Sequence, residues 1–327
     1  MKRETIRKKI SSLTAKFAAL LLAFTCAGTA WGATVTTEAE LRAAIAAAQN
    51  GQTVKLLADI ALSEKLVIPD GKDVTIDLNG KTITNDDVLG AALGYNKAII
   101  DVSGILSFVD SAGGGKVESV SAMNQAETIH VNATGSLNVT GIAVSSVGTG
   151  TNKKIINVQG GKVVADNATI SGTAVAYGIM NAYKGSTEIT VVGGTINVPG
   201  GTAISGDNGK VTVDGAALSG STGIGTSGGI NVITDATITA KVGVSAGGNG
   251  TTTIDGGTIS AENNGVTLTA GTLSIAGATV TGAECSLNIY KSASYNINVF
   301  TRFVPAAAQT LPAYFNDRAR EKLMPMA

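Results

Sequence analysis

The chain is poor in the residue types that stabilise small exported domains. Of its 327 residues, 2 are cysteine, 1 is histidine and 1 is tryptophan, while aromatic residues make up 4% and charged residues 15%. Cys26 lies near the N-terminus, so a chain that has lost its first residues keeps only Cys285 and can form no internal disulfide. Its stability must therefore come from packing and backbone pairing.

The N-terminal residues 1–32 have the pattern of a secretory signal peptide. Six basic residues and one acidic residue precede the apolar run 17–24, and small residues follow it. The run is too short for a membrane span, which needs about 20 residues. We expect cleavage at 30–33 and export of the mature chain. Cys26 leaves a lipoprotein signal open, although Ala-Phe-Thr before it fits a lipobox poorly.

The mature chain is mildly acidic. Residues 1–32 contain 6 of the 24 basic and 1 of the 24 acidic residues, which leaves 18 and 23 and a net charge of about −5. Phosphate binding needs a cationic surface, so this balance argues against a nucleic-acid partner. No later segment is long and apolar enough to span a bilayer, and we expect no transmembrane segment in the mature chain.

What the chain does have is glycine, with 42 residues, together with much Val, Ile, Thr, Ala, Asn and Ser. The glycines show no period of three, which excludes collagen, and the β-branched residues alternate with polar ones, which disfavours disorder. This composition indicates many short strands separated by Gly, Asn and Asp turns.

A repeat is centred on Thr-Ile-Ser-like triplets, whose central apolar residue we name the anchor. The nine anchors are Ile83, Val117, Val144, Ile170, Ile196, Leu218, Ile238, Ile259 and Val280. They are 34, 27, 26, 26, 22, 20, 21 and 21 residues apart, so the later units are regular and the earlier ones carry insertions. Most anchors are preceded by two alternating apolar residues and a small residue, and are followed by a Gly-apolar pair. Each unit therefore predicts three short strands.

The period predicts the fold. A unit of about 20–22 residues cannot bury its own apolar side, but coils stacked about 4.8 Å apart pair every backbone group with their neighbours. We predict an all-β fold, a single-stranded parallel β-helix (β-solenoid) of about nine coils over residues 53–285. A β-sandwich needs antiparallel hairpins and would not keep one register over nine units. Residues 286–327 would supply the last coil and a C-terminal cap or tail.

The segment 33–52 is predicted to cap the N-terminal end. Within it, 36–50 reads as a helix with Thr36 or Thr37 as N-cap and Gly51 as its stop. Leu41 and Ile45 form an apolar stripe that would cover the open end of the solenoid.

These segments resemble a known family. The helix, Thr53–Ile60 (TVKLLADI), Val74–Ile83 (VTIDLNGKTI) and the Gly-Gly-Thr-Ile-Ser units up to about residue 282 are similar to pectin-lyase-like, right-handed parallel β-helix proteins that bacteria secrete. The resemblance implies right-handed coiling and, for many members, glycan binding or surface display. It is a likeness of fold, which does not assign a function.

Residues for catalysis are not evident. The hydrolase motifs Asn-Thr-Asp, Asp-Asp, Gly-His-Gly and Arg-Ile-Lys do not occur in matching order. The single histidine, His130, lies in Thr-Ile-His-Val and is predicted to be a surface strand residue. We therefore predict no catalytic residue and no enzymatic activity, with a polysaccharide lyase or hydrolase as the alternative.

Acidic residues recur four positions before the anchors, in a column that reads Asp166, Val192, Asp214, Thr234 and Asp255. Carboxylates on alternate coils are about 9–10 Å apart, too far to share one calcium ion. We therefore interpret them as solvated turn residues and expect no metal and no cofactor. Asp235, one position over, leaves a bridging site open as an alternative.

Hydroxyl side chains flank the anchors and are predicted to face solvent. The pairs are Thr82/Thr84, Thr169/Ser171, Thr195/Asn197, Thr237/Thr239, Thr258/Ser260 and Thr279/Thr281. Such ranks suit the solvent face of any strand. Ice binding is the alternative, but Ala143 and Ala217 interrupt the ranks.

Insertions in the early units are predicted to form loops at 90–97, 150–154 and 176–185 on one side of neighbouring coils. Their aromatic, amide and amine side chains are suited to stacking on and hydrogen bonding a sugar, while Trp31 is removed with the signal. The candidate ligand-binding residues are Tyr95, Asn96, Lys97, Lys153, Lys154, Tyr177, Asn181, Tyr183 and Lys184.

The function predicted from these features is a secreted or surface-exposed, non-catalytic scaffold of adhesin type, whose partner is a glycan or a host or microbial surface. A structural component of an envelope or matrix is the other alternative to an enzyme.

Overall fold

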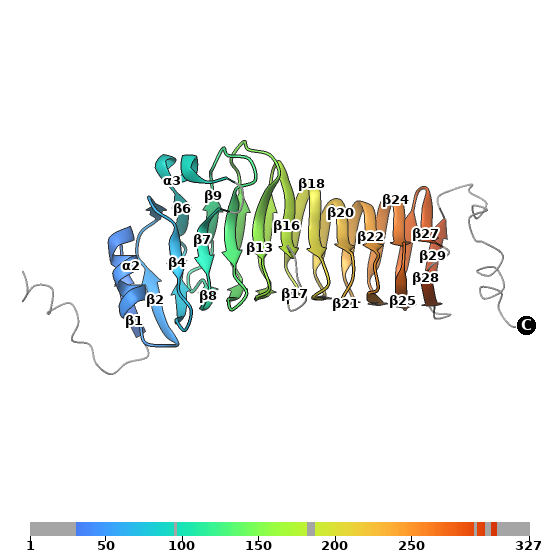
Figure 1. Cartoon of the computed structure of the whole chain (residues 1–327), viewed down its shortest axis with the longest axis horizontal. Coiled ribbons are helices and arrows are strands. Elements are labelled where there is room, and N and C mark those ends of the chain that lie inside the picture. Colours follow the sequence, from blue (N-terminus) through green and yellow to red (C-terminus); the bar gives the residue numbers. More distant parts are fainter. Residues whose placement is uncertain (1–30, 95–96, 182–186, 291–292, 298–301, 306–327) are drawn as a thin grey trace, which may run out of the picture.

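The computed structural model of the chain describes residues 31–94, 97–181, 187–290, 293–297 and 302–305. The chain coils around one long axis, and each coil contributes short strands to faces that run the length of the molecule (Figure 1). Each strand pairs in parallel with the equivalent strand of the next coil. The predicted parallel β-solenoid is confirmed.

Three faces surround the core. The first face is a 12-stranded sheet of β1 (Trp31–Val35), β2 (Gln52–Leu56), β5 (Asp73–Asp77), β8 (Ile105–Val109), β11 (Ser136–Thr140), β14 (Lys162–Asp166), β17 (Glu188–Val192), β19 (Lys210–Asp214), β21 (Ile230–Thr234), β23 (Thr251–Asp255), β25 (Gly271–Ala276) and β28 (Ala293–Ile297). A 17-stranded sheet makes the other two faces, because four long strands bend from one face into the other.

The second face carries the anchors. It consists of β3 (Ile60–Leu62), β6 (Thr82–Asn85), β9 (Lys116–Ser119), β12 (Ala143–Ser146), β15 (Thr169–Gly172), the first halves of β18 (Thr195–Gly206), β20 (Ala217–Thr226), β22 (Thr237–Ala246) and β24 (Thr258–Leu268), and then β26 (Thr279–Gly282) and β29 (Arg302–Pro305). The third face consists of β4 (Leu66–Ile68), β7 (Ala98–Val102), β10 (Glu127–Val131), β13 (Lys153–Val158), β16 (Val175–Asn181), the second halves of the four long strands, and β27 (Cys285–Ile289).

The solenoid has about eleven coils rather than the nine predicted, because the 12 strands of the first face are separated by eleven turns. All nine anchors lie in one register, and two further residues extend their column: Ile60 pairs with Ile83, and Phe303 pairs with Val280. Neither residue stands in a Thr-Ile-Ser-like triplet, so the motif did not reveal the anchors of the first and last coils, although the coils themselves lie within the predicted ranges 53–285 and 286–327.

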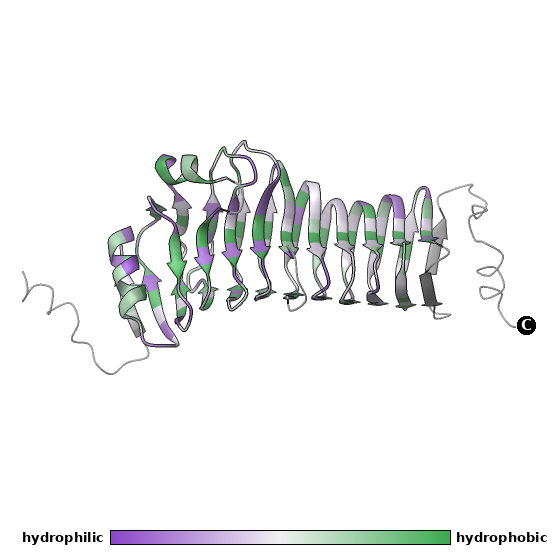
Figure 2. Cartoon of the chain, in the orientation of Figure 1, coloured by the Kyte–Doolittle hydropathy of each residue, from purple (hydrophilic) through white to green (hydrophobic). Residues whose placement is uncertain are grey.

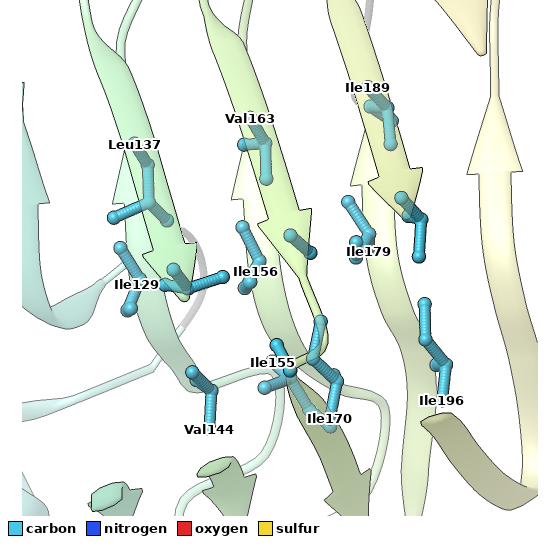
Figure 3. Packing of buried hydrophobic residues seen from close by; sticks show 14 of the residues in the cluster. Ile129, Leu137, Val144, Ile155, Ile156, Val163, Ile170, Ile179, Ile189 and Ile196 are labelled. Atoms are coloured by element: carbon cyan, nitrogen blue, oxygen red, sulfur yellow. The ribbon is translucent and has the colours of Figure 1, made fainter. Parts of the chain in front are cut away.

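The core consists of stacked apolar columns, one or more behind each face. Figure 3 shows Leu137, Val163 and Ile189 of the first face in line, and matching lines from the other faces. Each of these residues is buried, and apolar residues alternate with polar ones along many strands (Figure 2). Burying one such side chain contributes about 1.5–3 kcal/mol, so the repeated columns are the main source of stability.

The corner between the first and second faces explains the small residues before the anchors. Its first residue takes a positive φ in coil after coil, as at Asn167 (50°), Gly193 (59°) and Asp235 (47°). Asn, Asp and Gly tolerate this left-handed conformation best. The next residue packs against the coil below: a Cβ added to Gly194 would lie 2.3 Å from the carbonyl oxygen of Ala168. Most coils therefore have Gly or Ala at this position, although Ile142 occupies it in the coil of Val144.

The N-terminal helix is present as α2 (Glu38–Ala47), which lies at the N-terminal end of the stack (Figure 1). The Thr37 hydroxyl caps it by accepting a hydrogen bond from the Glu40 N–H at 3.2 Å, and Leu41 and Ile45 are buried as predicted. The helix ends at Ala47, before the predicted limit, and the strand β1 precedes it.

The short helix α3 (Asp87–Ala92) occupies the first part of the predicted loop 90–97. Among the described residues, no helix has the length and apolar character needed to cross a membrane. Apart from Trp31 and Gly32 in β1, the predicted signal peptide lies outside the described residues, as does the segment 306–327.

The buried anchor column predicts a contrast between neighbouring substitutions. We expect Ile238→Asp to prevent folding, because Ile238 is fully buried and the new carboxylate would have no partner in the core. Thr239→Asp, one residue further on an exposed position, should leave the fold intact. Circular dichroism and thermal unfolding of the two variants measure the difference, and equal melting temperatures would contradict the assigned faces.

The turn after β8 predicts acid sensitivity in the early coils. Asp110 accepts hydrogen bonds from the Gly80 and Gly115 N–H groups, each at 2.6 Å. Burial alone would raise the pKa of this carboxyl, but the bonds from Gly115 and Gly80 outweigh it and lower the pKa below the ordinary 3.8. The carboxylate therefore stabilises the fold above pH 3.8, and this contribution is lost as the pH falls through the lowered value.

Asp110→Asn should accordingly reduce the melting temperature at neutral pH, and the gap to the wild type should close in acid. Melting curves recorded from neutral to acidic pH test this expectation. A gap that stays constant over the whole range would show that the charge of Asp110 does not stabilise the turn.

Candidate functional site

A groove lies at the corner between the second and third faces, where the early insertions enter the third face. It encloses about 360 Å3 and is lined by Thr151, Asn152, Ala174, Val175, Ala176, Tyr177, Gly200, Gly201, Thr202, Ser221 and Thr222, which come from four successive coils. None of these lining residues is charged. The groove therefore offers hydroxyl, amide and backbone groups beside one aromatic ring.

The strand register explains why these residues meet. Lys154 of β13 pairs with Tyr177 of β16, Tyr177 pairs with Thr202 of β18, and Thr202 pairs with Thr222 of β20. One column of the third face thus runs through all four coils. In the sequence, Tyr177, Thr202 and Thr222 each directly precede a Gly-apolar or Ala-apolar pair, at 178–179, 203–204 and 223–224. The repeat predicted from the sequence includes such pairs but not the residues before them.

The shape of the groove depends on two backbone features. The pairing of β13 with β16 contains a bulge: Lys153 pairs with Val175 and Lys154 with Tyr177, so Ala176 is the extra residue. Bulges redirect side chains at the edges of sheets. The groove floor is formed by Gly201, where an added Cβ would lie 2.3 Å from the carbonyl oxygen of Val175. A side chain there would displace the neighbouring coil.

A second hollow, of about 340 Å3, lies on the other side of the same corner and extends along later coils. Its lining includes Pro199 of β18, Lys241 of β22 and Glu262 of β24. Because β18 and β20 contribute to both hollows, the two adjoin. The two hollows thus lie next to each other on either side of this corner.

The two candidate lysines of β13 are built into the wall of the solenoid. Lys153 is buried, its Nζ donates to the carbonyl oxygen of Gly148, and burial lowers the pKa of its amine. The Lys154 Nζ lies 3.1 Å from Oε1 of the fully buried Glu127. Both ammonium groups therefore hold parts of this chain together beside the groove.

Three of the other candidates lie among the described residues. Tyr177 lies in the groove and is partly exposed. Lys97 is exposed, and its Nζ donates to the Ala92 carbonyl at 3.3 Å. Asn181 is buried at the far end of β16, where its amide donates to the Asp207 carbonyl and its Oδ1 has no hydrogen-bond partner. The remaining candidates, Tyr95, Asn96, Tyr183 and Lys184, lie outside the described residues.

Two of the predicted loops extend into regular structure where they are described. The segment 150–154 ends in β13, which starts at Lys153, and the segment 176–185 begins inside β16, which runs to Asn181. The loop prediction was wrong at these positions because the third face of each coil starts immediately after the insertion.

The surface position predicted for His130 is wrong. His130 is 7% exposed, and its Nδ1 lies 2.6 Å from Oε2 of Glu127. Strict alternation would place residues three apart on opposite sides of a strand. In β10, however, all five residues are buried, and the Glu127 and His130 side chains meet.

Glu127 is the centre of a buried polar network that sequence analysis missed. Its Oε1 accepts from the Asn157 amide at 2.6 Å and faces Lys154, while its Oε2 faces His130. The register places these groups together, since Glu127 pairs with Lys154 and His130 with Asn157. The carboxylate has its hydrogen-bonding capacity taken up by its own chain.

The turn carboxylates keep the predicted column, in which Asp166, Val192, Asp214, Thr234 and Asp255 pair in succession. Within the described residues, no group of three or more His, Cys, Asp or Glu side chains is placed to hold a metal ion.

The buried network predicts a stability difference between two glutamates. Glu127→Ala leaves Lys154 and His130 buried without their carboxylate and should lower the free energy of unfolding by about 3 kcal/mol. Glu188→Ala removes the partner of Lys162 from an exposed pair at 2.9 Å and should change stability little. Urea unfolding of both variants measures the contrast, and similar losses would refute a structural role for the network.

A comparison of the chain with protein-family models finds no match, and no curated protein matches it either. A ligand of this solenoid must therefore be inferred from its own residues. The groove around Tyr177 is the candidate binding site.

Proposed function

We propose that the protein is an exported, non-catalytic solenoid that binds a glycan in the groove around Tyr177, as an adhesin-like scaffold of a bacterial cell surface. The observation that carries this proposal is the lining of the groove. An aromatic ring stands beside hydroxyl and amide side chains from neighbouring coils, and no lining side chain is charged. Sugars are recognised by stacking of their apolar faces on aromatic rings and by hydrogen bonds to their hydroxyl groups.

The geometry suits a chain of sugars better than a single one. Coils repeat at about 4.8 Å, so equivalent hydroxyl groups such as those of Thr202 and Thr222 recur at that spacing along the axis. The adjoining hollow at Lys241 and Glu262 would accommodate further sugars of such a chain along later coils. The signal-like residues 1–32 support export, and Lys97, which directly precedes β7 of the third face, would add a contact at the N-terminal end of the groove.

Polysaccharide cleavage is the second candidate, and the Glu127–His130 pair at 2.6 Å is the observation that favours it. A buried carboxylate beside a histidine can move a proton. Both oxygens of Glu127 are, however, engaged by Lys154, Asn157 and His130, which favours a structural role.

The test is binding of the purified mature protein to a glycan array, followed by titration of the best ligand. Tyr177→Ala should weaken binding about tenfold, the equivalent of about 1.4 kcal/mol, because the stacking ring is lost. Tyr177→Phe should keep most of the affinity. Tyr290→Ala, which removes an exposed tyrosine near the other end of the solenoid, is the control.

Three outcomes separate the candidates. Normal binding by Tyr177→Ala would place the site elsewhere. Release of reducing ends or unsaturated products, abolished by Glu127→Gln, would identify an enzyme. An array without any signal would favour a structural component of an envelope or matrix.

A further inference from the structure

The outward residues of the first face form three columns along the solenoid. The register aligns Lys162, Glu188, Lys210 and Ile230 at the strand starts, Val164, Thr190, Thr212 and Val232 at the centres, and Asp166, Val192, Asp214 and Thr234 at the strand ends. Two lysines and Glu188 therefore lie on one edge of the face, two aspartates lie on the other edge, and β-branched residues lie between them.

This face also exposes apolar side chains. Four of the eleven large hydrophobic residues that are exposed in the described part of the chain lie on it, namely Ile105, Val164, Val192 and Ile230, and Ile230 is 56% exposed. Isolated exposed hydrophobic residues are ordinary, but several on one flat face mark a contact surface.

The charged side chains of this face can pair with those of the same face in a second copy of the chain. A two-fold axis parallel to the solenoid would bring the start of each strand opposite the end of the same strand in a second copy. Lys162 would then face Asp166, Lys210 would face Asp214, and Ile105 would face Val109. Such a contact is isologous, so each pair forms twice.

One alternative, an antiparallel arrangement centred on β17, is unfavourable. A two-fold axis parallel to the strands would bring each column against itself. Centred on β17, it would place Lys162 opposite Lys210, Asp166 opposite Asp214, and Glu188 opposite its own copy. Like charges in direct opposition disfavour association.

The face is large enough for a stable contact. Twelve strands at about 4.8 Å, each of five residues at about 3.3 Å, make a surface of roughly 50 Å by 15 Å, or about 750 Å2 per copy. A standard protein interface buries about 800 Å2 per partner.

We infer that the first face is the contact surface of a symmetric homodimer, in which two parallel solenoids pack first face against first face. The groove around Tyr177 lies at the opposite corner of the coil and uses no residue of the first face. The dimer therefore leaves both grooves open.

The first test is the mass of the purified protein by multi-angle light scattering and sedimentation. The wild type should have twice the mass of one chain. Thr212 lies in the centre column, next to the two-fold axis, so Thr212→Arg places two arginines together and should give a monomer. Thr239→Arg changes an exposed strand threonine of the second face and should remain dimeric, with both variants folded by circular dichroism.

The second test is a charge exchange within β19. Asp214→Lys places a lysine opposite Lys210 of the other copy, and Lys210→Glu places an acid opposite Asp214, at both equivalent contacts, so each should raise the dissociation constant at least about tenfold. The double variant restores opposite charges and should recover dimerisation. A monomeric wild type, equal effects of Thr212→Arg and Thr239→Arg, or a double variant no more dimeric than the single ones would each overturn the inference.

Discussion

Backbone pairing between successive coils is the constraint on which the rest of this structure depends. Each strand bonds to the equivalent strand of the coils before and after it, so every residue is stacked on its counterpart about 4.8 Å away. A shift of one residue would turn every apolar column outward. The corner turns with positive φ, the small residues behind them and the anchor column all serve to keep this single register.

Stacking also determines how polar groups are accommodated inside the solenoid. A buried polar residue finds its partner in the neighbouring coil, as Glu127 finds Lys154. The same holds within the core, where the amide of Asn231 donates to Thr252 of the next coil at 3.2 Å and to Thr226 at 3.2 Å. Stacking thus gives some buried polar residues a partner in the next coil, which offsets part of the cost of removing them from water.

The fold separates its variable regions from its constant ones. The corner between the first and second faces keeps one turn in coil after coil, whereas the corner between the second and third faces ranges from the insertion with α3 to the continuous strands β20 and β22. Variation at this second corner changes no pairing in the core. A binding groove and a flat contact face can therefore coexist on one scaffold, because they use different parts of each coil.

The fold class could be read from the sequence because the period is local: each triplet and each small corner residue lies within one coil, and nine anchors sufficed to define the register. The tyrosine of the groove could be proposed for the same reason, since Tyr177 stands beside an insertion. The buried state of His130 and Lys153 could not be predicted from the sequence, because it depends on how their strands pack against neighbouring coils. The sequence by itself determined which residues recur and hence which ones stack; only the tertiary structure decided which polar side chains neutralise one another and which face the groove, because those contacts join residues 20 to 30 positions apart that no local pattern relates.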